Sequence, residues 1–251
     1  MPPASNQKPR MKFPGLIGSF YGDLPMTYWR IINQEVRLRL GGKNTAPMVA
    51  NCANDEVLDT LVRGEDWEGL TKLLTEMASV LPAAGADGLV ICGSPLNPVA
   101  REIGRAVGLP VVSMGKAIAE TLRLFRYRRV VVLGTKTCRE EEMWRAELAG
   151  ISLVDPTPGE RRWFAEAVDA GPTVDADCCR VEANRVMSSL RKKGVQAVVL
   201  AEPALAKWVN LEESLLPVFD AAEIHAWAAA GWSLAGAGCM LSAPPCVVRD
   251  S

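Results

Sequence analysis

Short apolar runs alternate with amphipathic stretches along most of the chain. The apolar runs are rich in Val, Ile and Leu, which is typical of parallel strands buried on both faces, and the stretches between them have helical spacing. This alternation predicts an α/β fold in which helices cover both faces of parallel sheets. The expected strands are Gly15–Gly18, Met48–Cys52, Leu89–Cys92, Pro110–Ser113, Val130–Leu133, Ile151–Val154, Ala197–Ala201 and Leu216–Phe219.

The strand-and-helix pattern occurs twice. Gly85–Gly93 (GADGLVICG) and Gly194–Glu202 (GVQAVVLAE) have the same length and an apolar centre, and each is followed by a helix and then by a strand that begins with proline. The first strands of the two halves also correspond, Gly15–Gly18 with Val131–Gly134. Such internal similarity indicates two lobes built on one topology.

Gly93 and Glu202 occupy the equivalent strand ends of the two repeats. In open parallel sheets, ligands bind at the carboxyl ends of the strands. Two similar lobes that face each other would form one cleft there. The repeat therefore predicts an active site in the cleft between the lobes, with Gly93 on one wall and Glu202 on the other.

Composition and motif content argue against several classes of protein. Hydrophobic residues make up 49% of the chain and charged residues 23%, as in a globular protein. The net charge of −1 and the lack of a basic face argue against nucleic acid as a partner. No apolar run reaches the roughly 18 residues of a membrane span. A single histidine, no Cys-x-x-Cys pair and no Gly-x-Gly-x-x-Gly segment argue against metal and dinucleotide sites.

The cysteines and the first residues bear on the compartment and on the extent of the fold. The seven cysteines are odd in number, the chain shows no signal-peptide pattern, and the adjacent Cys178 and Cys179 cannot easily pair with each other. We therefore expect reduced thiols and a cytoplasmic protein. Residues 1–10 are polar and rich in proline, and we expect them to form a disordered tail.

Four stretches carry motifs that occur together in one protein family. They are residues 28–46 (YWRIINQEVRLRLGGKNTA), 66–69 (DWEG), 132–135 (VLGT) and 217–226 (PVFDAAEIHA). In this order they resemble the first helix and "RLGGxxSA" segment, the "DWxG" helix start, the "LGTxxTM" loop and the "PLFDTTxIHA" segment of the aspartate/glutamate racemase superfamily, which includes hydantoin racemases. The resemblance covers nearly the whole chain past residue 11.

The resemblance implies two flavodoxin-like (Rossmann-like) lobes with parallel sheets, related by a pseudo-twofold axis. We expect an N-terminal lobe of residues 11–115 plus 223–251 and a C-terminal lobe of residues 116–222. Members of the superfamily commonly form homodimers, so we expect a dimer. The racemases of the superfamily need no cofactor. We therefore expect a small amino or carboxylic acid as substrate, and neither a metal nor pyridoxal phosphate.

The resemblance also implies a change at both catalytic positions. Racemases of the superfamily use two cysteines, because inversion requires one group to remove a proton and another to return one on the opposite face. A thiol with an ordinary pKa of about 8.5 can do both once tuned. Here Gly93 and Glu202 stand at the two cysteine positions. Cys92 lies one residue early, and neighbouring strand residues point to opposite faces, so we do not expect it to replace the first thiol.

Glu202 is the candidate acid/base. Burial would let this carboxylate take and return a proton, although a glutamate at a strand-to-helix turn is often only an exposed surface residue. Gly93 transfers no proton and would leave space where the first thiol stood. Some relatives that keep one thiol catalyse decarboxylation. Racemisation would need a second proton donor, for which Cys138 or water is the candidate.

The substrate-binding candidates lie at strand ends and helix starts. They are Tyr21, Asn51, Ser94, Asn97, Thr135, Lys136 and Thr137. Backbone N–H groups at the two helix starts suit a substrate carboxylate, although helix capping explains Ser94 equally well. Tyr21 would add aromatic bulk, which favours a substrate less polar than aspartate, or it is ordinary packing.

Two functional hypotheses follow. The first is an isomerase or lyase of the racemase family that uses Glu202 as a single acid/base in place of two cysteines. The second is a non-catalytic pseudoenzyme that binds a small acid. The hypotheses differ in whether Glu202 is needed for proton exchange at a substrate carbon.

Overall fold

The computed structural model describes residues 10–19, 23–134, 142–170, 176–202, 205–206, 209 and 214–237. It divides into two compact units. The first contains the described residues up to Cys92, Val99–Val112 and those from Ala226 onward. The second contains Gly93–Pro98 and the described residues of Ser113–His225. Each unit is built on its own parallel sheet.

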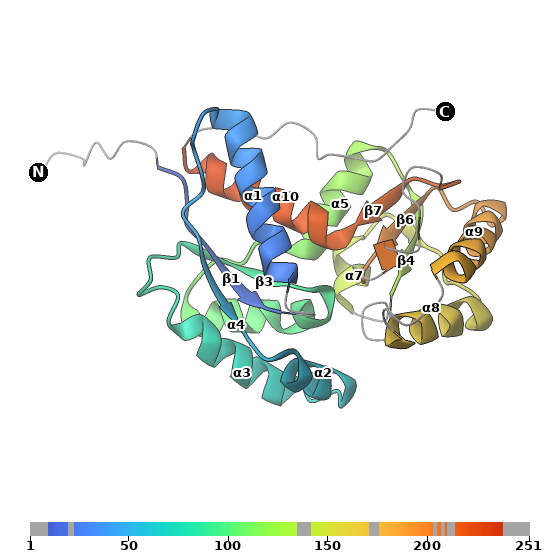
Figure 1. Cartoon of the computed structure of the whole chain (residues 1–251), viewed down its shortest axis with the longest axis horizontal. Helices are drawn as coiled ribbons and strands as arrows, with labels where there is room; N and C mark the ends of the chain where they lie inside the picture. Colours follow the sequence, from blue (N-terminus) through green and yellow to red (C-terminus); the bar gives the residue numbers. More distant parts are fainter. Residues whose placement is uncertain are drawn as a thin grey trace, which may run out of the picture. The chain divides into compact units, whose positions relative to one another are not determined.

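The first unit contains a three-stranded parallel sheet in the order β2-β1-β3. Its strands are β1 (Pro14–Gly18), β2 (Val49–Cys52) and β3 (Gly88–Cys92). The helices that follow along the chain are α1 (Leu24–Leu40), α2 (Asp55–Arg63), α3 (Trp67–Ser79) and α4 (Ala100–Val107), with the 3-10 helix η1 (Ser94–Val99) directly before α4. Helix α3 packs against both β1 and α4 (Figure 1).

The second unit contains a four-stranded parallel sheet in the order β5-β4-β6-β7. Its strands are β4 (Arg129–Leu133), β5 (Ser152–Leu153), β6 (Ala197–Leu200) and β7 (Val218–Asp220). The helices are α5 (Met114–Leu124), α7 (Glu142–Glu147), α8 (Pro158–Ala170) and α9 (Ala176–Lys192), and α10 (Ala221–Ala235) begins directly after β7. The core joins strand residues such as Val131 and Val198 to Phe164 of α8 and Met187 of α9.

The duplication predicted from the sequence extends to individual hydrogen bonds. Leu89 pairs with Val111 through a single parallel bridge, and Val198 pairs with Val218 at the equivalent place. The Leu89 amide donates to the carbonyl of Pro110 at 2.8 Å, and the Val198 amide donates to that of Pro217 at 2.9 Å. The two sheets therefore follow one plan, and they differ in that the expected strand Pro110–Ser113 is reduced to this bridge.

Close backbone approach explains why the first unit needs a glycine at Gly88. A Cβ atom there would lie 2.6 Å from the ring of Trp232 on α10. Ser233, the next residue of α10, accepts a backbone hydrogen bond from Lys12, just before β1. The C-terminal half of α10 is thus fixed to the first sheet by packing and by hydrogen bonding.

The strand cores agree with the continuous apolar runs. All five residues of β1 and of β3 are buried, as are all four of β6. Fully burying one such aliphatic side chain stabilises a fold by about 1.5–3 kcal/mol. No helix in the described part of the chain has the length and apolar character that crossing a membrane requires.

Candidate functional site

Gly93 forms the turn directly after β3. Its φ of +99° lies in a region that side-chain-bearing residues rarely adopt. The carbonyl of Gly93 accepts hydrogen bonds from Asn97 Nδ2 at 2.7 Å and from the Leu96 amide at 3.3 Å. Asn97 is buried, so its amide fixes the shape of the turn from inside the fold.

Ser94 connects this turn to the start of α5. Its side chain is buried, and Oγ donates to the thioether sulfur of Met114 at 3.3 Å. A thioether is a weak acceptor, so this hydroxyl can turn to an oxygen anion at little cost. Both residues belong to the second unit, together with Gly93 and Asn97.

Glu202 lies two residues beyond the end of β6 and is only 7% exposed. The preceding residue, Ala201, donates its amide to the carbonyl of Leu133 at 2.8 Å, which holds the strand end against β4. The Glu202 carbonyl accepts from the Leu205 amide at 3.0 Å, just as the Gly93 carbonyl accepts from that of Leu96. The two turns are therefore equivalent, as the repeat predicts, and both belong to the second unit.

The Cys92 thiol, one residue before Gly93, is not in a position or protonation state to act as a base. It is fully buried, and its sulfur donates to the carbonyl of Val90 within its own strand. Burial raises the pKa of the Cys92 thiol well above its ordinary value, and the neighbouring Cys52 raises it further. Cys52 itself is exposed at the end of β2, and its pKa is raised by desolvation and by Asp55. Both thiols therefore stay protonated near neutral pH.

Asp220 is a further carboxyl group at a strand end, and it was not among the residues predicted for the site. It ends β7 and pairs with Leu200, so it lies at the same edge of the sheet as Glu202. Its Oδ1 accepts from the amides of Ala222 at 2.8 Å and Glu223 at 3.1 Å, and thereby caps α10. Desolvation raises the pKa of Asp220 to about 6. An aspartate that ends a strand directly before a helix was the available sequence signal.

The remaining candidates are placed in part. Asn51 donates from Nδ2 to the carbonyl of Met77 on α3 at 3.0 Å, so one of its amide donors is engaged within the fold. Five candidates lie outside the described residues: Tyr21, Thr135, Lys136, Thr137 and Cys138. Among the residues that are described, no group of three or more His, Cys, Asp or Glu side chains is placed to hold a metal ion.

A buried carboxylate at a strand end has the chemistry of a general acid/base, because burial removes the water that would compete for a proton. The Ser94 hydroxyl can donate to an anion. Only one of the two equivalent strand ends carries a group that can accept a proton.

Known proteins resemble this chain over most of its length. The family model of Asp/Glu/hydantoin racemases matches residues 26–229. A Yersinia pestis protein assigned to the Asp/Glu racemases is similar over 89% of this chain and 100% of its own, at 29% identity and a TM-score of 0.83. An aspartate racemase homologue from Pyrococcus horikoshii OT3 covers 87% of this chain and 97% of its own, at 23% identity and a TM-score of 0.75. These similarities confirm the predicted two-lobe α/β fold with parallel sheets.

A decarboxylase shares the fold as well. A variant of arylmalonate decarboxylase covers 93% of this chain and 96% of its own, at 16% identity and a TM-score of 0.56. Similarity at this level concerns the fold and not the reaction.

Proposed function

Because this chain belongs to the Asp/Glu/hydantoin racemase family, we propose that it is an enzyme that acts without a cofactor on a small amino or carboxylic acid, with Glu202 as a single acid/base. The observation that carries the proposal is the buried carboxylate of Glu202 at a strand end whose structural equivalent is Gly93. The family includes racemases and decarboxylases, both of which pass through a carbanion next to a carboxylate.

The proposed chemistry needs one proton-transfer group. In an isomerisation, the Glu202 carboxylate takes the proton from the substrate α-carbon, the electron pair delocalises into the adjacent carboxylate and a conjugated double bond, and the same carboxyl group returns the proton to a different carbon. In a decarboxylation, the bond to the leaving carboxylate breaks and carbon dioxide departs. The electron pair then stays on the carbon until the protonated Glu202 donates to it. Either route needs the charge of the intermediate to be stabilised, a role that we assign to Ser94 and to the turn at Gly93.

Gly93 supports single-face chemistry. Its backbone conformation disfavours any side chain, and its hydrogen atom cannot transfer a proton. Two-base racemisation would therefore need a donor from elsewhere, and we retain Cys138 or water for that role. Asn97 would act as a positioning residue that holds the turn. Tyr21, Asn51, Thr135, Lys136 and Thr137 stay predictions as substrate-binding residues.

The test uses NMR to measure deuterium exchange at the α-carbon of a panel of amino and dicarboxylic acids in D2O. We expect exchange with the wild-type protein and its loss in Glu202→Gln, because the amide cannot accept the proton. Glu166→Gln is the matched control, since Glu166 is an exposed carboxylate on α8. Exchange that persists unchanged in Glu202→Gln would rule out Glu202 as the base. If the wild-type protein exchanges the proton, the chirality of its product separates racemisation from single-face catalysis.

The alternative is a non-catalytic protein that binds a small acid, and the absence of a thiol at both Gly93 and Glu202 favours it. It predicts no exchange with any acid of the panel, together with ligand binding that Glu202→Gln leaves intact. Calorimetric titration of the same panel distinguishes the two functions. A homodimer and a cytoplasmic location also remain proposals, and light scattering of the purified protein tests the first.

A further inference from the structure

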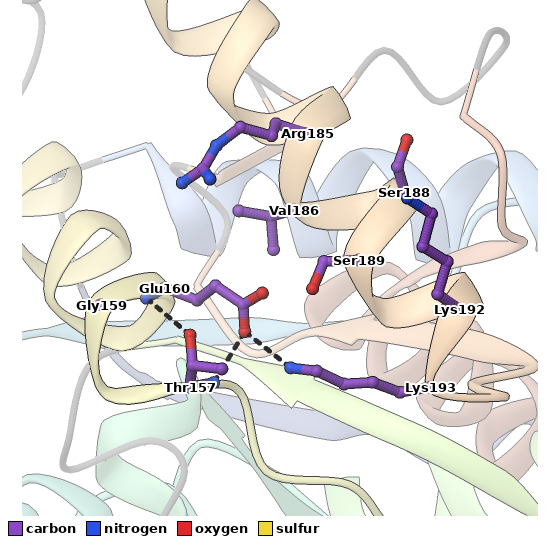
Figure 2. A pocket seen from close by; sticks show the side chains of 9 residues that line it. All are labelled: Thr157, Gly159, Glu160, Arg185, Val186, Ser188, Ser189, Lys192 and Lys193. Atoms are coloured by element: carbon purple, nitrogen blue, oxygen red, sulfur yellow. Dashed lines mark hydrogen bonds and ion pairs between the residues drawn. The ribbon is translucent and has the colours of Figure 1, made fainter.

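A groove in the second unit lies between the start of α8 and the last turns of α9. Its volume is about 660 Å³, within the usual range of about 300–1,000 Å³ for small-molecule sites. Its lining residues are Thr157, Gly159, Glu160, Arg185, Val186, Ser188, Ser189, Lys192 and Lys193. Figure 2 shows the Glu160 side chain between the two helices, joined by dashed lines to Thr157 and Lys193.

The groove is cationic, although the whole chain carries a net charge of −1. Three positive side chains line it, those of Arg185, Lys192 and Lys193, against the single carboxylate of Glu160. Clustered charge of one sign on a concave surface concentrates ions of the opposite sign. The hydroxyl groups of Thr157, Ser188 and Ser189 add hydrogen-bonding groups for an oxyanion.

The Glu160 carboxylate is a negative charge that the groove residues stabilise by hydrogen bonds. Its Oε2 accepts from the Thr157 amide at 2.7 Å and from Lys193 Nζ at 3.1 Å. Although burial opposes the charged form, these hydrogen bonds and one from Ser189 lower the pKa of Glu160 to about 2. The lining thus stabilises a fixed carboxylate strongly, and two of its cations are not engaged by that carboxylate.

Those two cations are accessible to a ligand. Arg185 pairs with Glu182 one turn earlier on α9, but its side chain is 72% exposed, so the pair exchanges readily with another anion. Within the described part of the chain, Lys192 makes no ion pair. The aliphatic stems of the lysines offer apolar surface for the carbon part of an organic anion.

The groove lies at the opposite edge of the sheet from Glu202. Lys193 precedes β6 and accepts a hydrogen bond on its carbonyl from Arg129 Nε at the start of β4, at 3.2 Å. Glu202 follows the far end of β6. At about 3.3 Å per residue, the four residues of β6 alone span roughly 13 Å between the two places. A ligand in the groove would therefore not touch Glu202.

We propose that this groove binds a small organic dianion, a phosphate monoester or a dicarboxylate, through Arg185 and Lys192, with Lys193 shared between Glu160 and the ligand. A single inorganic ion would leave much of the volume empty. Since the groove lies away from Glu202, the proposal holds whether or not the chain catalyses proton exchange.

Isothermal titration calorimetry of the full chain tests the proposal. The probes are glycerol 3-phosphate and succinate, in a buffer without phosphate and at constant ionic strength. We expect saturable binding of at least one probe and a Kd raised about tenfold in Lys192→Ala and in Arg185→Ala, because each removes one charge-assisted contact. The matched control Lys72→Ala removes an exposed lysine from α3 in the first unit and should bind like wild type.

A variant that should lower the Kd, and not raise it, makes the test more specific. Glu160→Gln removes the competing carboxylate and frees Lys193, so it should lower the Kd for the same probe several-fold. Thermal unfolding would confirm that each variant is folded. No binding of either probe to wild type at millimolar concentration, or equal affinity in wild type, Lys192→Ala and Arg185→Ala, would overturn the proposal. Binding of only one probe would decide between the phosphate and the dicarboxylate.

Discussion

Replacing Glu160 with glutamine should remove an acid-sensitive part of the stability of the second unit. Thr157 and Glu160 form a reciprocal cap at the start of α8, since the Glu160 amide also donates to Thr157 Oγ1 at 3.3 Å. Hydrogen bonds from Thr157, Ser189 and Lys193 outweigh burial and move the pKa of Glu160 from an ordinary 4.5 to about 2. At about 1.4 kcal/mol per pKa unit, the charged form contributes about 3–4 kcal/mol.

The sign of the pH dependence follows from the lowered pKa. Because the folded state binds this proton more weakly than the unfolded state does, the stabilisation is fully present above about pH 5 and is lost as the pH falls toward 2. Glutamine cannot ionise. Glu160→Gln should therefore be less stable than wild type by about 3–4 kcal/mol at pH 7 and by under about 1 kcal/mol near pH 2, where only a neutral hydrogen bond differs.

Urea unfolding at several pH values between 7 and 2 measures this difference. Hydrogen exchange of the backbone amides of α8 gives a local measure, which remains valid if the two units unfold separately. Glu166→Gln, on the exposed face of the same helix, serves as the control and should follow wild type at every pH. A gap between wild type and Glu160→Gln that stays constant from pH 7 to pH 3 would refute the reasoning, because it would assign the effect to shape and not to charge.

Three further predictions concern Asp220 and two glycines. Because desolvation raises the pKa of Asp220 to about 6, the stability that this group contributes is present below about pH 4 and is lost by about 1–3 kcal/mol as the pH rises through 6. Asp220→Asn, whose amide oxygen still caps α10, should abolish that loss in thermal unfolding at pH 4 and pH 7. Gly93→Ala should cost about 1–2 kcal/mol in chemical denaturation, because its φ of +99° strains any residue with a Cβ. Gly88→Ala should cost about 1–3 kcal/mol, since the added Cβ would overlap the Trp232 ring. Gly159→Ala, where no atom lies within 4 Å of the added Cβ, should cost nothing.

The strands could be predicted from the sequence because each is a continuous apolar run that a parallel sheet buries on both faces. β3 and β6 begin or end within one residue of their expected bounds. The strand expected at Pro110–Ser113 is a single bridge at Val111, and β5 contains only Ser152 and Leu153. Apolar residues mark where a strand is buried, but the length over which it pairs depends on the neighbouring strand, which the local sequence does not contain.

The parts of the site that follow from the repeat could be predicted from the sequence. Interactions between residues far apart in the chain could not. Gly93 and Glu202 were placed at equivalent strand ends by alignment of the two halves, and their hydrogen bonds agree. The pair between Glu160 and Lys193 joins residues that are 33 positions apart. Only the packing of α8 on α9 brings them together. The raised pKa of Asp220 likewise depends on burial, which no motif records.

The two repeats show that a backbone hydrogen bond can be kept while the side chain at that position changes. The Asp87 carboxylate accepts from the Phe13 amide before β1, and at the equivalent place the Gln196 side chain accepts from the Arg129 amide at the start of β4. The side chain has changed, and the hydrogen bond to the backbone has not. At the two strand ends, the carbonyl groups of Gly93 and Glu202 accept backbone hydrogen bonds that close the turn, and at Gly93 the Asn97 side chain adds another. Glu202→Gln leaves this backbone bond in place, so loss of proton exchange in a variant that thermal unfolding shows to be folded would report on chemistry and not on a collapsed strand end.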